Sequence, residues 1–175
     1  MQLSKFKLLF APFLAAALLL QGCGWHLRGA EPIPTELQTL HLQAGSANNT
    51  FTRALKRSFS AMDVDLTETA AEAPYTLSVS PIHNERRVLS TTGTAKVAEY
   101  LITSSLVYSV IDSEGEERVH PTRISVEKTY LYNRDNAISA YEEESLLREE
   151  MQRDLIQQLL RRYRALQPAT DVSAK

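Results

Sequence analysis

Hydrophobic positions recur along the chain in two different periods, and each period predicts one kind of secondary structure. Tyr75, Leu77 and Val79 alternate with polar residues, which is typical of a half-buried strand ending at Pro81. A longer alternation over 97–111 places these residues on one face: Ala98, Tyr100, Ile102, Leu106, Tyr108 and Val110. Weaker patterns predict short strands at 37–42 and 124–130. The chain is therefore expected to form four strands.

Two segments have helical spacing instead. Asn49 is a suitable N-cap for a first helix, whose apolar stripe is Phe51, Leu55, Phe59 and Met62. For the second helix, Ser139 and Glu142 predict a capping box at its start. Its predicted core positions are Leu147, Met151, Leu155, Leu159 and Leu166, widened by Leu146, Ile156 and Tyr163. Glutamates near its start and arginines near its end complement the helix dipole.

The order strand, helix, three strands, helix predicts an α+β fold, a four-stranded mainly antiparallel sheet with two α-helices packed on one face. Residues 67–74 are expected to form a loop, Asp112–Glu116 a hairpin turn, and the polar segment 84–95 a strand end or a loop. The second face of the long strand carries Val97, Leu101, Val107 and Ile111 among polar residues. A partner against this face and a merely tolerated apolar surface both fit that composition.

The N-terminus changes this picture. Lys5 and Lys7 precede an apolar run of about 13 residues, too short to cross a bilayer, for which roughly 20 are needed. The run ends in Leu-Gln-Gly before Cys23, the single cysteine, and this pattern predicts a bacterial lipoprotein signal. A plain signal peptide that happens to precede a cysteine is the alternative. We therefore expect residues 1–22 to be cleaved and Cys23 to be acylated.

The predicted organisation follows from this cleavage. Residues 23–36 form a lipid-anchored leader, 37–166 a single domain and 167–175 a disordered tail. Gly24, in place of an aspartate, points to the outer membrane of a Gram-negative bacterium, on its periplasmic side. The formal net charge of the whole chain is −2. Cleavage of the signal removes two lysines and no acidic residue, so the remaining chain is more acidic. This acidic balance argues against nucleic acid as a partner.

Residues that carry chemistry are sparse. The four histidines, His26, His41, His83 and His120, have no metal-ligand spacing, so no metal site is expected. Nucleophile-elbow and phosphate-loop motifs are absent from the sequence. We therefore expect no enzyme activity and no cofactor apart from the covalent lipid on Cys23.

Two sets of residues remain candidates for binding. Trp25, Leu27 and Arg28 directly follow the anchor and could contact a partner, although an aromatic residue near a membrane needs no specific partner. The second set consists of basic residues that could meet anionic phosphates: Arg86, Arg87, Lys96 and Lys128. Arg123 is a further basic residue of this region, on the last predicted strand. A solvated basic face explains this second set equally simply.

The run Gly22-Cys23-Gly24-Trp25-His26-Leu27-Arg28-Gly29 resembles the start of the mature protein in the LptE family of lipopolysaccharide-assembly lipoproteins. Ala98-Glu99-Tyr100 and the stretch from Tyr132 to Tyr163 are similar to that family as well. The resemblance implies two helices on a four-stranded sheet. It also implies a non-enzymatic plug and assembly partner of the outer-membrane β-barrel LptD, which contacts lipopolysaccharide during its delivery to the outer leaflet.

A function from a different class stays open on the sequence alone. The chain could be a free, periplasm-facing lipoprotein that acts as a binding module, or a hydrolase without a recognised motif. Either would need a concave pocket with convergent polar groups. For the phosphate-binding set, the resemblance implies lipopolysaccharide as the anionic ligand.

Overall fold

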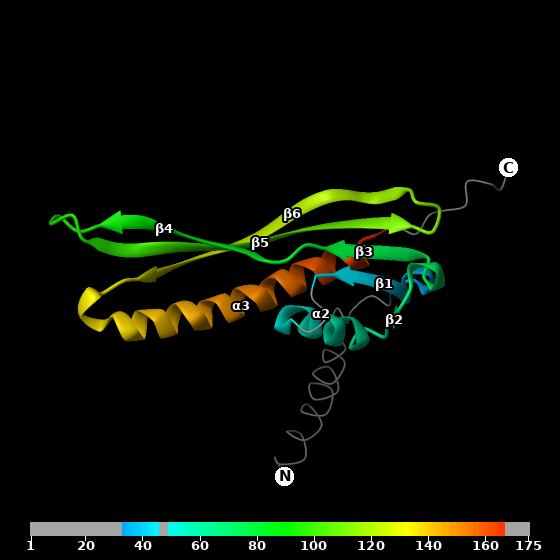
Figure 1. Cartoon of the computed structure of the whole chain (residues 1–175), viewed down its shortest axis with the longest axis horizontal. Coiled ribbons are helices and arrows are strands. Elements are labelled where there is room, and N and C mark those ends of the chain that lie inside the picture. Colours follow the sequence, from blue (N-terminus) through cyan, green and yellow to red (C-terminus); the bar gives the residue numbers. More distant parts are fainter. Residues whose placement is uncertain (1–32, 46–48, 167–175) are drawn as a thin grey trace, which may run out of the picture. The chain divides into compact units, whose positions relative to one another are not determined.

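The computed structural model describes residues 33–45 and 49–166, and the compact unit that contains them begins at Ile33 (Figure 1). Its elements, in chain order, are η2 (Thr35–Leu37), β1 (Thr39–Ala44), α2 (Thr50–Ser60), β2 (Asp65–Thr67), η3 (Ala70–Glu72), β3 (Tyr75–Val79), β4 (His83–Thr91), β5 (Val97–Asp112), β6 (Glu117–Leu131), η4 (Arg134–Asn136) and α3 (Ala137–Arg164).

The six strands form one mixed sheet around β5. Strand β6 pairs antiparallel with most of β5, while β4 and β3 pair antiparallel with its first and second halves. Strand β1 is parallel to both β3 and β2. The β1-α2-β2 segment is therefore a parallel unit that needs a crossover helix, which α2 supplies.

The main core lies between this sheet and the two helices. Leu55 and Phe59 of α2 and Leu155 and Leu159 of α3 are completely buried. Phe59 meets the ring of Tyr163 edge-on, with 5.2 Å between the ring centroids. A smaller cluster, nearer the N-terminal end of α3, consists of Ile102, Tyr130, Ala140 and Met151. Figure 1 shows why there are two clusters, since α3 extends past α2 and continues beneath β4, β5 and β6.

The predicted fold class is confirmed, but the sheet has six strands where four were expected. The additional strands are β2, which ends at the first residue of the segment expected to be a loop, and β4, which occupies most of the ambiguous segment 84–95. Strand β4 has mostly exposed side chains and therefore no alternation of buried and polar positions. Its backbone is held by pairing with β5, a long-range interaction that local periodicity does not reveal.

Two predicted local signals, the cap of the first helix and the hairpin turn, are confirmed. The Asn49 side chain accepts a hydrogen bond of 2.8 Å from the Phe51 backbone N–H and caps α2. In the hairpin between β5 and β6, the Asp112 carboxylate accepts backbone hydrogen bonds from Glu114 and Glu116. Gly115 has a φ of 84°, a left-handed conformation that a glycine adopts without steric cost.

The predicted start of α3 is wrong in its detail. The helix begins at Ala137, so Ser139 lies inside its first turn and donates a hydrogen bond to the Asn136 side chain. Ser139 and Glu142 therefore form no capping box. Leu146, expected to widen the core stripe, is 67% exposed, while Glu144 two residues earlier is buried. The helix thus turns a carboxylate toward the sheet at a position where sequence periodicity favours an apolar side chain.

The ends of the chain are only partly described. Ile33 and Leu37 are buried in the main core, so the packed structure begins within the segment expected to be the leader. Residues 1–32, including Cys23, Trp25, Leu27 and Arg28, lie outside the described residues, as does the predicted tail 167–175. Within the described part of the chain, no helix has the length and apolarity needed to cross a membrane.

Candidate functional site

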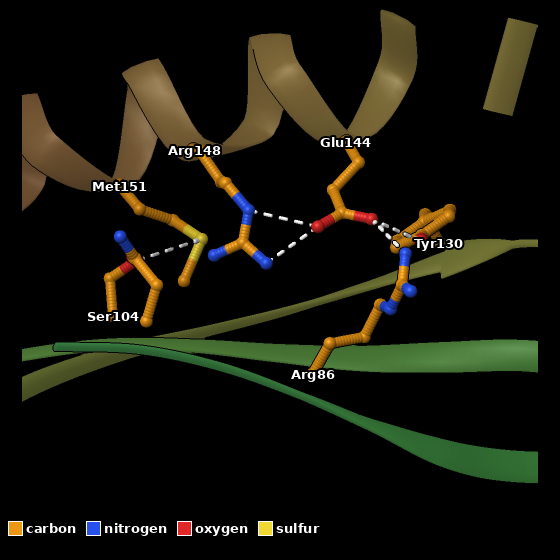
Figure 2. Close-up of polar contacts among 7 residues, drawn as sticks. Arg86, Ser104, Tyr130, Glu144, Arg148 and Met151 are labelled. Atoms are coloured by element: carbon orange, nitrogen blue, oxygen red, sulfur yellow. Dashed lines mark hydrogen bonds and ion pairs between the residues drawn. The ribbon is translucent and has the colours of Figure 1, made fainter. Parts of the chain in front are cut away.

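A buried carboxylate near the N-terminal end of α3 connects this helix to strands β4 and β6. Glu144 accepts hydrogen bonds from the Tyr130 hydroxyl of β6 at 2.6 Å and from Arg86 Nη1 of β4 at 2.8 Å. Arg148, one helical turn later, donates to the same carboxylate from Nε and Nη2. Figure 2 shows the carboxylate of Glu144 between these partners, below the helix and above the strands. We call these four residues the Glu144 cluster.

The electrostatics of the Glu144 cluster favour an ionised carboxylate. Burial by itself would raise the pKa of Glu144, but hydrogen bonds from Tyr130, Arg148 and Arg86 outweigh it and hold that pKa below its ordinary value of 4.5. Burial, and then the hydrogen bond to Glu144, raise the pKa of Tyr130 to about 12, so its hydroxyl remains a donor. The hydrogen bond to Glu144 also raises the pKa of Arg86.

The chemistry of this cluster is structural. Arg86 lies with its guanidinium carbon 4.8 Å from the ring centroid of Tyr100, so β4, β5, β6 and α3 are all joined around one carboxylate. Beside it, the Ser104 hydroxyl donates to Asn84 Oδ1 at 2.6 Å and lies 3.9 Å from the sulfur of Met151. The carboxylate of Glu144 accepts hydrogen bonds from Arg86, Tyr130 and Arg148 of the same domain. These bonds attach helix α3 to the sheet, so the cluster acts as a latch between them.

The opposite face of the sheet is open. Figure 1 shows that both described helices lie on one side of the strands. On the other side, a shallow depression of about 250 Å³ is lined by Glu85, Arg87, Thr103, Arg123, Ser125 and Glu127. We call these six residues the polar shelf. Arg123 Nη2 donates to the Ser105 hydroxyl at 2.7 Å, and Thr103 donates to Glu127 at 3.2 Å.

The four predicted phosphate-binding residues do not form one cluster. Arg86 and Arg87 are neighbours in β4, opposite Ile102 and Leu101 of β5, and therefore point to opposite faces of the sheet. Arg86 belongs to the Glu144 cluster, and Lys128 pairs with Glu150 of α3 at 2.6 Å. Both cations therefore already have a carboxylate of α3 as their partner.

The other two candidates lie elsewhere. Arg87 lies on the polar shelf, and Lys96 is exposed in the turn between β4 and β5. Neither has an ion pair with any described residue. Of the four, Arg87 and Lys96 therefore keep a cationic group available for an anionic ligand.

Sequence reasoning missed Glu144 as part of a site, and it named Arg123 only as a basic residue of the last strand, without placing it beside Arg87. The helix dipole alone accounts for a glutamate near the start of α3. Only the contact of α3 with β6 shows that the Glu144 side chain is buried. Arg123 could have been associated with Arg87 only through the strand register, because the two residues come from β6 and β4 on either side of β5. No cluster of three or more metal-ligating side chains occurs among residues 33–45 and 49–166.

Comparisons with known proteins agree with this architecture. The chain is 30% identical over 158 residues to the LPS-assembly lipoprotein LptE of Pectobacterium atrosepticum, which covers 90% of this chain and 85% of that protein. It is 24% identical over 160 residues to the LPS-assembly lipoprotein LptE of Photorhabdus laumondii, covering 91% of this chain and 87% of that protein.

Solved structures show the same fold. The crystal structure of the rare lipoprotein B from Shewanella oneidensis matches with a TM-score of 0.64 at 24% identity, over 70% of this chain and 91% of that one. The solution NMR structure of lipoprotein B from Nitrosomonas europaea matches with a TM-score of 0.66 at 22% identity, over 79% of this chain and 88% of that one.

The family comparison covers most of the domain. The family described as "LptE: Lipopolysaccharide-assembly" matches residues 37–163, from the end of η2 to the last turn of α3. This range contains all six strands and both α-helices, together with the Glu144 cluster and the polar shelf. The match lies entirely after the Gly22–Gly29 motif and is therefore independent of it, and the chain belongs to the LptE family of lipopolysaccharide-assembly lipoproteins.

Proposed function

We propose that this chain is an outer-membrane lipoprotein, anchored through acylated Cys23 on the periplasmic side, that plugs and helps to assemble an LptD-type β-barrel. In this role it binds lipopolysaccharide during its delivery to the outer leaflet. The family match over residues 37–163 carries the proposal, because it covers the whole described sheet and both helices. Assembly, rather than catalysis, is the activity that this family's description names.

The composition of the open sheet face supports a plug. The interior of an outer-membrane barrel is polar, so a protein inside it must present polar surface to the wall. On this face Thr103 and Ser125 accompany the charged groups of the polar shelf, and Ser109 lies on the same side of β5, while the buried Ser105 hydroxyl is bonded to Arg123. Leu101 is only 7% exposed there, while Val107 is 39% and Leu131 71% exposed, so these two large apolar side chains are also open on this face.

For lipopolysaccharide, we propose Arg87 and Lys96 as the first contacts with its phosphates. Both are exposed, and a guanidinium can bind two oxygens of a phosphate side by side. Arg123 adds a second guanidinium to the polar shelf near Arg87. Arg86 and Lys128 are secondary candidates, because an anionic ligand would first have to replace Glu144 or Glu150 as their partner.

The barrel partnership is tested by co-expression of the tagged full-length chain with its LptD-type partner, gentle detergent extraction and sizing. We expect elution with a partner several times larger. Elution as a monomer under conditions that keep the barrel folded would contradict the plug and favour a free periplasm-facing binding module or hydrolase.

Binding of purified lipopolysaccharide is measured with the soluble domain at low salt. We expect Arg87→Glu with Lys96→Glu to weaken binding, and added salt to weaken the binding of the unaltered domain. Arg118→Glu with Arg162→Glu is the matched control, because both arginines are exposed and lie outside the polar shelf. Equal binding by the test and control variants would remove Arg87 and Lys96 from the site. Arg86 is left unchanged because its reversal would also break the Glu144 cluster.

A further inference from the structure

The charged residues of helix α2 are all positive and lie on its outer side. Helix α2 contains Arg53, Lys56 and Arg57 and no acidic residue, and all three cations are exposed. They lie opposite the buried stripe formed by Phe51, Leu55 and Phe59, as the helical period requires. None of the three forms an ion pair with a described residue. Arg53 and Arg57 are also one turn apart, a like-charge spacing that destabilises an isolated helix.

A groove of about 310 Å³ runs between α2 and α3 beside these cations. Arg57 of α2 and Arg153 of α3 contribute cationic groups to its lining. Its other lining residues are small, polar or apolar: Ala54, Ser58, Ala61, Ile156 and Gln157. We call this feature the basic groove. Arg161 and Arg164 extend the exposed positive charge along the last turns of α3.

The shape and composition of the basic groove distinguish between two kinds of anionic partner. A helix that lies on a bilayer inserts large apolar side chains below the headgroups. The large exposed hydrophobic residues of the described structure are all elsewhere: Val88, Leu89, Val107, Leu131, Ile138, Tyr141 and Leu146. A concave groove with a small-residue floor and two guanidinium groups fits carboxylates on an extended chain, which each arginine can bind with two parallel hydrogen bonds.

We propose that the basic groove binds an acidic polypeptide segment of the barrel partner. This inference rests on the barrel partnership proposed above and adds the chemistry of one contact. The charges of α2 then face carboxylates instead of one another, and the segment lies across Ala54 and Ala61 between the two helices. Complementary charge of this kind fixes the register of two proteins and accelerates their encounter.

The test uses the full-length chain co-expressed with the barrel partner and isolated in mild detergent. The test variant combines Arg53→Glu, Lys56→Glu and Arg57→Glu. The matched control combines Arg118→Glu and Arg134→Glu, which alter exposed cations outside both helices. We expect the test variant to bind the barrel at least ~10-fold more weakly, because like charges across an interface are strongly unfavourable. The control should bind as the unaltered chain does.

A second, milder variant guards against a failure to fold. Arg57→Gln with Arg153→Gln removes the two charges but keeps polar side chains, and circular dichroism and the denaturant midpoint check its structure. We expect its complex to lose stability and to depend less steeply on salt than the unaltered complex. A photo-crosslinker at position 57 should capture a barrel peptide rich in Asp and Glu.

The outcomes separate the inference from the proposed function. If the unaltered chain forms the complex and both groove variants bind equally well, the inference is overturned and the partnership stands. If the unaltered chain forms no complex, the partnership fails and the inference fails with it. If barrel binding is unchanged while the variants lose binding to vesicles of phosphatidylglycerol, the groove recognises lipid headgroups and the acidic segment is excluded.

Discussion

The hydroxyl of Tyr130, near the end of β6, donates a hydrogen bond of 2.6 Å to the carboxylate of Glu144 in the second turn of α3. Only 14 residues separate the two, yet the bond closes the connection between the sheet and the helix that follows it. Arg86 brings β4 to the same carboxylate. The outer part of α3 is therefore attached to the sheet by a polar latch as well as by the small core around Met151.

Glu144→Gln should destabilise the domain. The neutral amide leaves Arg86 and Arg148 without their anionic partner, and breaking a buried ion pair costs about 3–5 kcal/mol. Because Arg86 is 38% exposed and water screens its charge, we expect a smaller loss of about 2–3 kcal/mol in the free energy of unfolding. Denaturant unfolding of the soluble domain measures it.

Glu143→Gln is the matched control, because Glu143 is exposed on the same turn of α3 and has no ion pair with a described residue. It should change the free energy of unfolding by less than about 0.5 kcal/mol, as surface substitutions usually do. Equal midpoints for the two variants would show that Glu144 contributes no more than its exposed neighbour.

The contribution of Glu144 should depend on pH. Its pKa is lower in the folded chain than its ordinary value of 4.5, so the unfolded chain binds the proton more tightly. Stability from this group is therefore complete above that value and is lost as the pH falls through the folded pKa. We expect the stability difference between the unaltered domain and Glu144→Gln to be constant near neutral pH and to shrink below about pH 4. A difference that grows on acidification would contradict this assignment.

The main core gives a prediction about packing. Phe59 and Leu155 are completely buried, so replacing either by alanine should lower the free energy of unfolding by about 2–5 kcal/mol. Leu146→Ala is the control for the same chemistry, because that leucine is 67% exposed on α3. Denaturant midpoints should fall for the first two variants and stay unchanged for the third. A large loss at Leu146 would mean that the helix is rotated.

The hairpin turn gives a prediction about backbone conformation. Gly115→Ala places a Cβ on a residue with a φ of 84°, which should cost about 1 kcal/mol. Gly93→Ala is the matched substitution in the turn between β4 and β5, where an added Cβ would meet no atom within 4 Å and φ is not left-handed. It should be neutral or slightly stabilising. Thermal unfolding compares them, and an equal shift in both variants would contradict the argument.

Lipidation is tested at the sequence level. Cys23→Ala removes the predicted acylation site, and each acyl methylene lost from the bilayer removes about 0.8 kcal/mol of membrane affinity. In cells without the barrel partner, we expect the variant domain to remain folded and to leave the outer-membrane fraction. Complete retention there in the absence of that partner would show that the anchor is elsewhere.

Several elements could be read from the sequence because their signals are local. The stripe of α2, its Asn49 cap and the hairpin at Gly115 depend on residues close together in the chain. The structure confirms all three, except that α2 ends at Ser60 and Met62 packs against the core from beyond the helix. The same is true of the alternation in β5, whose even-numbered residues from Tyr100 to Val110 face the helices. The lipoprotein signal ending at Cys23 is local as well, although it stays a prediction.

The polar parts of the structure could not be predicted in this way. Strand β4 has no buried face of its own, so its conformation exists only through the backbone hydrogen bonds that β5 provides. Arg86 and Arg87 are adjacent in sequence, and only the pleat of a paired strand directs their side chains to opposite faces of the sheet.

By itself, the sequence determined the fold class, the positions of both helices and the family resemblance, because apolar spacing and short motifs survive without knowledge of the partner elements. Only the tertiary structure decided that Glu144 is buried, that Arg86 and Lys128 are occupied by carboxylates, and that α2 and α3 share a basic groove. The physical reason is that a charged side chain has no preferred neighbour within its own segment. Its partner is chosen by strand register and helix docking, which join residues far apart in the chain.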